Sequence, residues 1–148
     1  ASNVGVKIHL MVRGICCLSP NVTGMSENIT VTAIIGRFLE HGRIYVFANK
    51  GKFQDDSNLV YIASADIMPR NLYHRVEAFI PLENQTVRSQ VLSQVLPALI
   101  NDRKNSWILN EFGEYYKYEE SDNLFCAHTY FMNNPSLSGQ GSLAKIQT

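Results

Sequence analysis

Short runs of apolar residues separated by polar loops make up the first half of the chain, a pattern typical of β-strands. The first four residues predict a helical turn that ends at Gly5, because glycine readily adopts the left-handed conformation that follows a helix. We interpret this turn as the end of a longer helix that has been truncated. Residues 6–12 predict the first strand, and residues 14–28 predict a long loop of the kind that often carries function.

Runs rich in β-branched and aromatic residues predict four further strands, at residues 29–35, 43–48, 59–64 and 75–82. Pro69 lies between the last two of these runs. It excludes a long regular helix there, because proline disrupts the interior of a helix.

After Asn84 the spacing of apolar residues changes to the 3.6-residue period of a helix. The apolar positions that follow this period are Val87, Val91, Leu92, Val95, Leu96, Leu99 and Ile100. We expect an amphipathic helix that begins behind an Asn84 cap, kinks at Pro97 and packs on the sheet.

The remaining chain predicts a hairpin and a last helix. Residues 106–110 and 114–120 lie on either side of Gly113 and predict two short strands joined by a turn. Residues 123–132 predict the last helix, which the following Asn-Asn-Pro sequence ends.

Length and composition fit one domain followed by a tail. With 148 residues, of which 45% are hydrophobic, the chain is long enough to bury a core. Serine and glycine are common in residues 136–148, so we expect a domain over residues 1–135 and a flexible tail beyond it.

The net charge of the chain is zero and does not indicate a class of binding partner. Thirteen Lys+Arg residues offset thirteen Asp+Glu residues, and no basic stripe of the kind found in nucleic-acid-binding proteins occurs. No apolar run approaches the roughly 20 residues that cross a bilayer, and the N-terminus lacks the pattern of a signal peptide. We therefore expect a soluble protein that does not bind nucleic acid.

The three cysteines favour a reducing compartment. Cys16 and Cys17 are sequence neighbours and cannot form an ordinary disulfide with each other, so one thiol remains whichever of them pairs with Cys126. We interpret Cys16 and Cys17 as small loop or core residues. No Cys-x-x-Cys occurs and the histidines are scattered, so we predict no metal site.

Candidate chemistry begins at His41 and Arg43, directly before an apolar run. If the extended backbone reaches back to His41, alternation places His41, Arg43 and Tyr45 on one face. A guanidinium binds phosphate through two parallel hydrogen bonds, and an imidazole can donate a hydrogen bond, move a proton or accept a phosphoryl group. The alternative is a surface histidine beside a solvated arginine, and the pair alone does not decide between them.

A second element follows downstream, where the small-residue turn Ala63–Asp66 precedes Arg70 and a strand that carries Glu77. This order resembles a half-site of the phospholipase D superfamily, in which the histidine attacks phosphorus. Two departures occur, because Arg43 replaces the expected lysine and Ala48 replaces the expected aspartate. These departures make the half-site degenerate, and a phosphodiesterase or nuclease half-site remains an alternative function.

A closer resemblance extends over nearly the whole chain. Five segments resemble the carboxy-terminal domain of bacterial-type polyphosphate kinase, at residues 12–20, 26–29, 36–49, 61–71 and 130–139. Ile67 departs from the tryptophan that is usual in the family. The resemblance implies an α/β fold of phospholipase D-like type, with a mixed β-sheet flanked by helices.

The implied activity is reversible transfer of the γ-phosphoryl group of ATP to inorganic polyphosphate, through a phosphohistidine in the preceding domain, which this sequence lacks. Carried over by position, Arg13 and His41 contact the phosphates of the nucleotide, and His41 is the catalytic residue of this half. Arg43 and Arg70 either line the same anionic channel or form structural ion pairs with Asp66 or Glu77. The magnesium ligands lie outside this chain.

The implied partners are ATP or ADP, polyphosphate, the preceding domains and further copies of the intact enzyme, in the cytoplasm or at the inner face of the membrane. Alone, these 148 residues are expected to be inactive. A non-catalytic phosphate-binding module, or an oligomer-forming domain built on the apolar helix, is the other alternative.

Other candidate side chains receive structural interpretations. Ser64 is expected to bond backbone in its turn, and Asp66 to cap the short segment after it. His9 is buried mid-strand by pattern, and we interpret His9, His74 and His128 as packing or surface residues. We do not expect an aromatic stacking platform from the three neighbouring tyrosines, Tyr115, Tyr116 and Tyr118.

Overall fold

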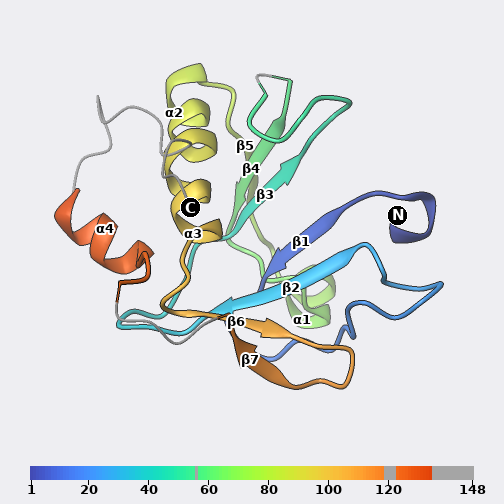
Figure 1. Cartoon of the computed structure of the whole chain (residues 1–148). Coiled ribbons are helices and arrows are strands. Elements are labelled where there is room, and N and C mark those ends of the chain that lie inside the picture. Colours follow the sequence, from blue (N-terminus) through green and yellow to red (C-terminus); the bar gives the residue numbers. More distant parts are fainter. Residues whose placement is uncertain (56, 119–122, 135–148) are drawn as a thin grey trace. The chain divides into compact units, whose positions relative to one another are not determined.

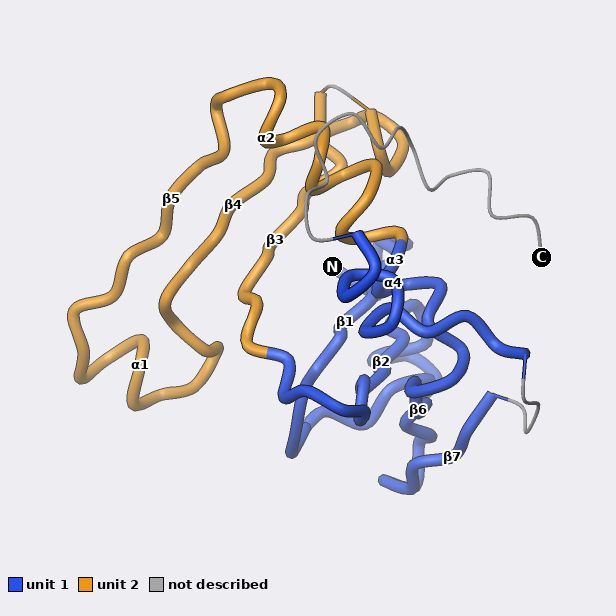
Figure 2. The backbone as a smooth tube through the Cα atoms, turned by 90° about the vertical axis from the view of Figure 1, so that its left-hand side faces the viewer, with its two compact units in different colours: residues 1–40, 98–135 blue, residues 41–97, 136–148 orange. Residues whose placement is uncertain are grey.

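The structure is a computed structural model that describes residues 1–55, 57–118 and 123–134 (Figure 1). The predicted tail at residues 136–148 lies outside the described residues. The chain divides into two compact units, and each has its own sheet (Figure 2). Unit 1 contains residues 1–40 and the described residues from 98 onward, and unit 2 contains residues 41–97.

Unit 1 holds a four-stranded sheet in the order β1-β2-β6-β7. Its strands are β1 (Ile8–Met11), β2 (Ile29–Ile34), β6 (Ser106–Leu109) and β7 (Tyr115–Lys117). The β1 and β2 strands are parallel and the other pairs are antiparallel, so the sheet is mixed, as the family resemblance implied. The predicted hairpin is β6-β7, and Gly113 adopts the expected positive φ in its turn.

The strand β2 is central, and its last four residues are all buried. Both of its faces are therefore covered, which explains its continuous run of β-branched and small residues. The buried apolar residues of unit 1 include Val31, Ala33, Ile34, Leu109 and Ala127.

The segment before β1 and the loop after it agree with the prediction. A 3-10 turn, η1 (Ser2–Val4), ends at Gly5, whose φ is 85°. Residues 14–28 contain no strand or helix. The buried hydroxyl of Ser26 organises this loop, because it donates to the Ser19 carbonyl at 2.5 Å and accepts from the Val22 N–H at 3.2 Å.

The last described helix, α4 (Ala127–Asn133), begins four residues later than predicted. Its start is set by Asp102, a fully buried residue whose carboxylate accepts a hydrogen bond from the Ala127 N–H at 2.9 Å. Because Asp102 and Ala127 are 25 positions apart, the sequence around Ala127 contains no pattern that marks the start of the helix.

Unit 2 holds a three-stranded antiparallel sheet in the order β3-β4-β5. The strands are β3 (Ile44–Phe47), β4 (Leu59–Ala63) and β5 (Phe79–Pro81), and β5 is shorter than predicted. Three aromatic rings gather on one face, because Phe79 lies 5.0 Å from Tyr45 and 4.9 Å from Tyr61 between ring centroids.

Pro69 begins a short helix, α1 (Pro69–His74). The first helical position tolerates proline, because the N–H there has no partner within the helix. The prediction that no long helix forms here is confirmed.

The predicted amphipathic helix consists of α2 (Gln85–Gln90), a π-helical turn η2 (Val91–Val95) and α3 (Leu96–Ile100). Asn84 caps it as predicted, and its side-chain oxygen accepts from the Val87 N–H at 3.1 Å. The π turn ends two residues before Pro97, whose ring would crowd the carbonyl four residues earlier in a regular α-helix. The helix is therefore irregular near this proline through a widened turn, whereas the predicted kink stays a prediction.

The mixed sheet of unit 1, the antiparallel sheet of unit 2 and their helices confirm an α/β fold. Among the described residues, the helices are all too short or too polar to cross a membrane.

Candidate functional site

Arg13 lies directly after β1, as predicted from the sequence, and is half-buried. The N–H of Val12 donates to the Thr32 carbonyl at 2.8 Å, so the ladder with β2 continues up to the residue before Arg13. The guanidinium Nη1 donates to the backbone carbonyl of Glu40 at 3.2 Å. The end of β1 therefore directs this side chain toward the segment after β2.

The carboxylate of Glu40 is held in turn by His128. The two side chains meet at 2.6 Å, between Nε2 of His128 and Oε1 of Glu40, and their exposed fractions are 4% and 28%. The other ring nitrogen, Nδ1, accepts a hydrogen bond from the Phe38 N–H at 3.4 Å. With Nδ1 accepting from Phe38, Nε2 carries a proton and donates to the carboxylate.

The ring of His128 is enclosed tightly. Phe38 packs against it with ring centroids 5.5 Å apart. A Cβ at Gly36 would come within 2.8 Å of His128 Nδ1 and equally close to the Asn105 side chain. A side chain at position 36 would therefore force the His128 ring or the Asn105 side chain to shift.

His128 is a packing residue, as one of the two interpretations had it, but its partner Glu40 was not recognised. The two residues are 88 positions apart, so no spacing rule relates them. The sequence offered no signal for this pair beyond the occurrence of both residue types.

His41 is exposed and lies before β3, as predicted. Its backbone carbonyl accepts from Arg43 Nη1 at 3.1 Å. Arg13 belongs to unit 1, and His41 is the first residue of unit 2. The contacts of each residue are therefore described within its own unit.

Arg43 forms an ion pair with Asp66, and 3.0 Å separates Nε from Oδ1. Tyr45 donates to the carbonyl of Ala65 at 3.1 Å, so both side chains reach the same turn from one face of β3. Burial and the Asp66 charge raise the pKa of Tyr45, partly opposed by Arg43. Of the interpretations offered for Arg43, the ion pair with Asp66 is the one observed.

Glu77 organises the end of β4. The Ser64 hydroxyl donates to one carboxylate oxygen, and Asn71 donates to the other at 2.7 Å. These hydrogen bonds, that of Ser64 above all, lower the pKa of Glu77. The Ser64 hydroxyl also accepts from the Ala78 N–H at 3.0 Å, so it bonds backbone, although directly before β5 and not in its own turn.

One of the remaining interpretations holds in part, and that of Asp66 as a cap is wrong. His9 lies mid-strand in the edge strand β1 and is a surface residue, although partial burial of its ring lowers its pKa. Its ring lies 2.8 Å from the Thr32 hydroxyl. The N-cap position of α1 is occupied by Met68 without a side-chain cap, and the Asp66 carboxylate pairs with Arg43.

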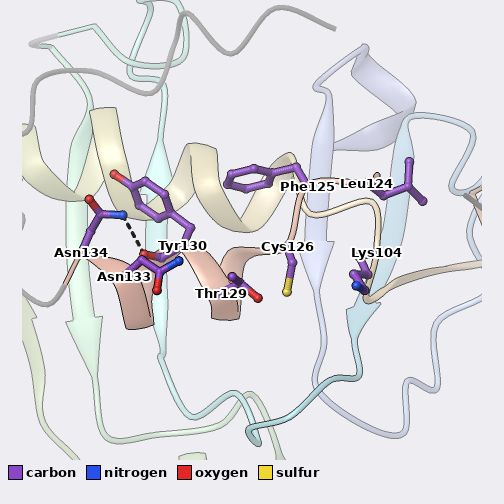
Figure 3. A pocket seen from close by; sticks show the side chains of 8 residues that line it. All are labelled: Lys104, Leu124, Phe125, Cys126, Thr129, Tyr130, Asn133 and Asn134. Atoms are coloured by element: carbon purple, nitrogen blue, oxygen red, sulfur yellow. Dashed lines mark hydrogen bonds between the residues drawn. The ribbon is translucent and has the colours of Figure 1, made fainter. Parts of the chain in front are cut away.

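A pocket of about 310 Å³ lies beside α4 (Figure 3). Asn105 donates to the sulfur of Cys126 there at 3.0 Å. Burial raises the pKa of Cys126, but hydrogen bonds from Thr129 and Asn105 outweigh it and lower the pKa overall. The lining residues are Lys104, Leu124, Phe125, Cys126, Thr129, Tyr130, Asn133 and Asn134.

The described residues contain no group of three or more His, Cys, Asp or Glu side chains that could hold a metal ion. The three cysteines, two of them adjacent in the loop after β1, are free thiols.

Comparison with known proteins shows the family to which the chain belongs. The family model for polyphosphate kinase C-terminal domain 2 matches residues 1–127. A polyphosphate kinase from Erythrobacter litoralis (strain HTCC2594) is 56% identical over 141 residues, which are 95% of this chain and 20% of that protein. One from Paraburkholderia phytofirmans (strain DSM 17436 / LMG 22146 / PsJN) is 46% identical over 115 residues, which are 78% of this chain and 16% of that protein.

The crystal structure of polyphosphate kinase from Porphyromonas gingivalis has a similar fold, with a TM-score of 0.79 and 35% identity. The match covers 90% of this chain and 20% of that one. The fold therefore defines an α/β domain of the phospholipase D-like class. The chain belongs to the polyphosphate kinase family, and it spans about a fifth of the length of these relatives.

Proposed function

We propose that this chain is part of an ATP:polyphosphate phosphotransferase and contacts the phosphate groups of ATP through Arg13 and His41. The observation that carries the proposal is the family match over residues 1–127, which contains both side chains. The relatives with which it aligns are named polyphosphate kinases.

In the proposed reaction, the bond between the γ-phosphorus of ATP and the bridging oxygen of ADP breaks, and a phosphorus–nitrogen bond to a histidine of the preceding domain forms. The terminal oxygen of polyphosphate then attacks this phosphorus, the histidine leaves, and the polymer is one phosphate longer. The steps run in reverse when ADP accepts the phosphoryl group.

Phosphoryl transfer depends mainly on positioning and on stabilising negative charge. The guanidinium of Arg13 supplies a fixed positive charge and several N–H donors. His41 donates a hydrogen bond and assists the proton balance at the attacking or leaving oxygen. Arg70, an exposed residue of α1, is proposed to line the channel for polyphosphate, whereas the observed ion pair supports a structural role for Arg43.

Magnesium would neutralise phosphate charge in the intact enzyme, and we assign its ligands to parts of the enzyme outside this chain. We also propose a cytoplasmic homo-oligomer that attaches peripherally to the inner face of the membrane. The free thiols are consistent with that reducing compartment. Cell fractionation and light scattering of the intact enzyme test these two points.

The test is substitution in the intact enzyme with measurement of polyphosphate synthesis from ATP. Arg13→Ala is expected to lower kcat/KM by about 10²–10³-fold, and His41→Ala by a similar factor. Matched controls are Arg75→Ala and His74→Ala, at exposed positions of unit 2, which are expected to stay within about twofold of the parent. Parental synthesis rates in His41→Ala would refute the role of that residue.

A hydrolysis assay distinguishes the proposed phosphotransferase from the alternative, a phosphodiesterase half-site. The intact enzyme is expected to leave a simple phosphodiester intact, and the isolated 148-residue chain to show no turnover with ATP and polyphosphate. Hydrolysis of the diester by the intact enzyme would favour the alternative.

A further inference from the structure

We propose that His128 is a positioning residue for Arg13 and that it acts through Glu40. The inference rests on the proposed function, because it assigns to a buried histidine the task of orienting a side chain that contacts phosphate. All of the residues involved lie in unit 1.

The first step of the argument is that Glu40 is contacted at two different groups. Its carboxylate accepts from His128 Nε2 at 2.6 Å, and its backbone carbonyl accepts from Arg13 Nη1 at 3.2 Å. Movement of the Glu40 side chain away from His128 would allow the peptide to rotate, and the carbonyl would rotate with it. The position of the acceptor for Arg13 therefore depends on the contact with His128.

The second step is that His128 is itself fixed. It is the second residue of α4, whose first N–H is held by the buried Asp102 at 2.9 Å. The Phe38 N–H fixes its Nδ1, and the missing side chain of Gly36 leaves the space it occupies. A buried ring with both nitrogens engaged has one orientation, so it presents Nε2–H to Glu40 as a rigid donor.

The third step concerns how the hydrogen bond from Nη1 to the Glu40 carbonyl restrains the guanidinium of Arg13. The guanidinium is planar and carries its five N–H donors in a rigid arrangement, so a bond from one nitrogen restricts the plane in which the others lie. Binding of a tetrahedral phosphate depends on that plane, and a misplacement of about 1 Å can cost on the order of 100-fold in rate. The contact between His128 and Glu40 thus supports the orientation of the Arg13 guanidinium through the Glu40 carbonyl.

The two ring contacts can be separated by substitution in the intact enzyme. In His128→Gln, the amide nitrogen occupies the place of Nε2 and still donates to Glu40, while the acceptor for Phe38 is lost. In His128→Asn, the amide oxygen occupies the place of Nδ1 and still accepts from Phe38, while the shorter side chain does not reach Glu40. The pair therefore compares loss of one contact with loss of the other.

We expect His128→Asn to lower kcat/KM for ATP by about tenfold, and His128→Gln to retain several times more activity than His128→Asn. Each variant is also made together with Arg13→Ala. If His128 acts through Arg13, the change to Asn has less than about twofold effect once Arg13 is absent. Thermal unfolding of each variant shows whether both substitutions perturb the fold equally.

The outcomes separate the two proposals. If Arg13→Ala alone leaves synthesis unchanged, the proposed function of Arg13 is wrong. If Arg13→Ala is impaired and the effect of His128→Asn multiplies with it, the proposed function stands and the positioning role of His128 is wrong.

A second pair of variants applies if His128→Asn does not fold. Glu40→Gln keeps an oxygen that accepts from His128, and Glu40→Ala does not. Glu40→Ala is expected to be about tenfold less active than Glu40→Gln, and the difference is expected to disappear in the Arg13→Ala background. Equal activity of the two Glu40 variants would overturn the inference.

Discussion

The carboxylate of Asp102 accepts a hydrogen bond from the backbone N–H of Ala127 at 2.9 Å, across 25 positions of sequence. The same carboxylate accepts from the Asn105 N–H at 2.7 Å, and the residue has no exposed surface. One buried side chain thus joins the turn before β6 to the start of α4, the helix that carries His128.

Asp102→Ala is expected to lower the free energy of unfolding of the 148-residue chain by about 2–4 kcal/mol. The substitution leaves the buried N–H of Ala127 and the part-buried N–H of Asn105 without their acceptor, and a fully buried loss costs about 1–3 kcal/mol, a part-buried one less. Urea denaturation followed by circular dichroism measures the change. The matched control is Glu111→Ala, at an exposed turn, and equal losses in the two variants would contradict the assignment.

Gly36→Ala is expected to destabilise the chain by about 1–3 kcal/mol, because the added methyl group would lie 2.8 Å from both His128 and Asn105. Gly14→Ala is the matched control. An added Cβ at Gly14 meets nothing within 4 Å, so this variant is expected to change stability by about 0.5 kcal/mol or less. The same denaturation experiment compares the two, and a Gly36→Ala variant as stable as the control would show that the ring can move aside.

The lowered pKa of Glu77 makes a pH-dependent prediction. Because the folded-state pKa lies below the ordinary value of 4.5, the stabilisation is fully present above that value and is lost as the pH falls through the folded-state pKa. Ser64→Ala removes the strongest donor and is expected to raise the pKa of Glu77 toward the ordinary range. Titration of the carboxyl carbon by NMR measures it. Ser93→Ala, whose hydroxyl bonds the carbonyl of Ser89, is the control that is expected to leave this titration unchanged.

The elements that the sequence predicted well are those determined by neighbours in the chain. The Asn84 cap acts three residues away, and the turn at Gly113 requires only a residue that tolerates positive φ. The alternation predicted for His41, Arg43 and Tyr45 is confirmed for Tyr45 and for Arg43, directly before β3, because the period of a strand is local. It stays a prediction for His41.

The features that the sequence did not predict depend on distant partners. The start of α4 is set by Asp102, and the pairing of Glu40 with His128 joins segments from opposite halves of the sequence. A single sequence contains no pattern that relates such positions. For the candidate site, local order gave the positions of Arg13 and His41 relative to β1 and β3, while the support of Arg13 by Glu40 emerged only from the fold.

The ion pair between Arg43 and Asp66 allows the structural and channel-lining roles of Arg43 to be separated. The two side chains are only 14% and 23% exposed, so we expect Arg43→Ala and Asp66→Ala each to lower the free energy of unfolding by about 1 kcal/mol. Because the two residues share one contact, the double variant is expected to lose less than the sum of the single losses.

The same variants are then assayed in the intact enzyme. If Arg43 is structural, Arg43→Ala and Asp66→Ala have similar KM values for polyphosphate. If Arg43 lines the channel, its substitution raises that KM while Asp66→Ala does not, since removal of a carboxylate does not weaken binding of an anionic polymer. Arg70→Ala, at an exposed position of α1, completes the comparison: as a channel residue it is expected to raise the KM without a loss of stability. An unchanged KM in Arg70→Ala would contradict its proposed place along the polyphosphate chain.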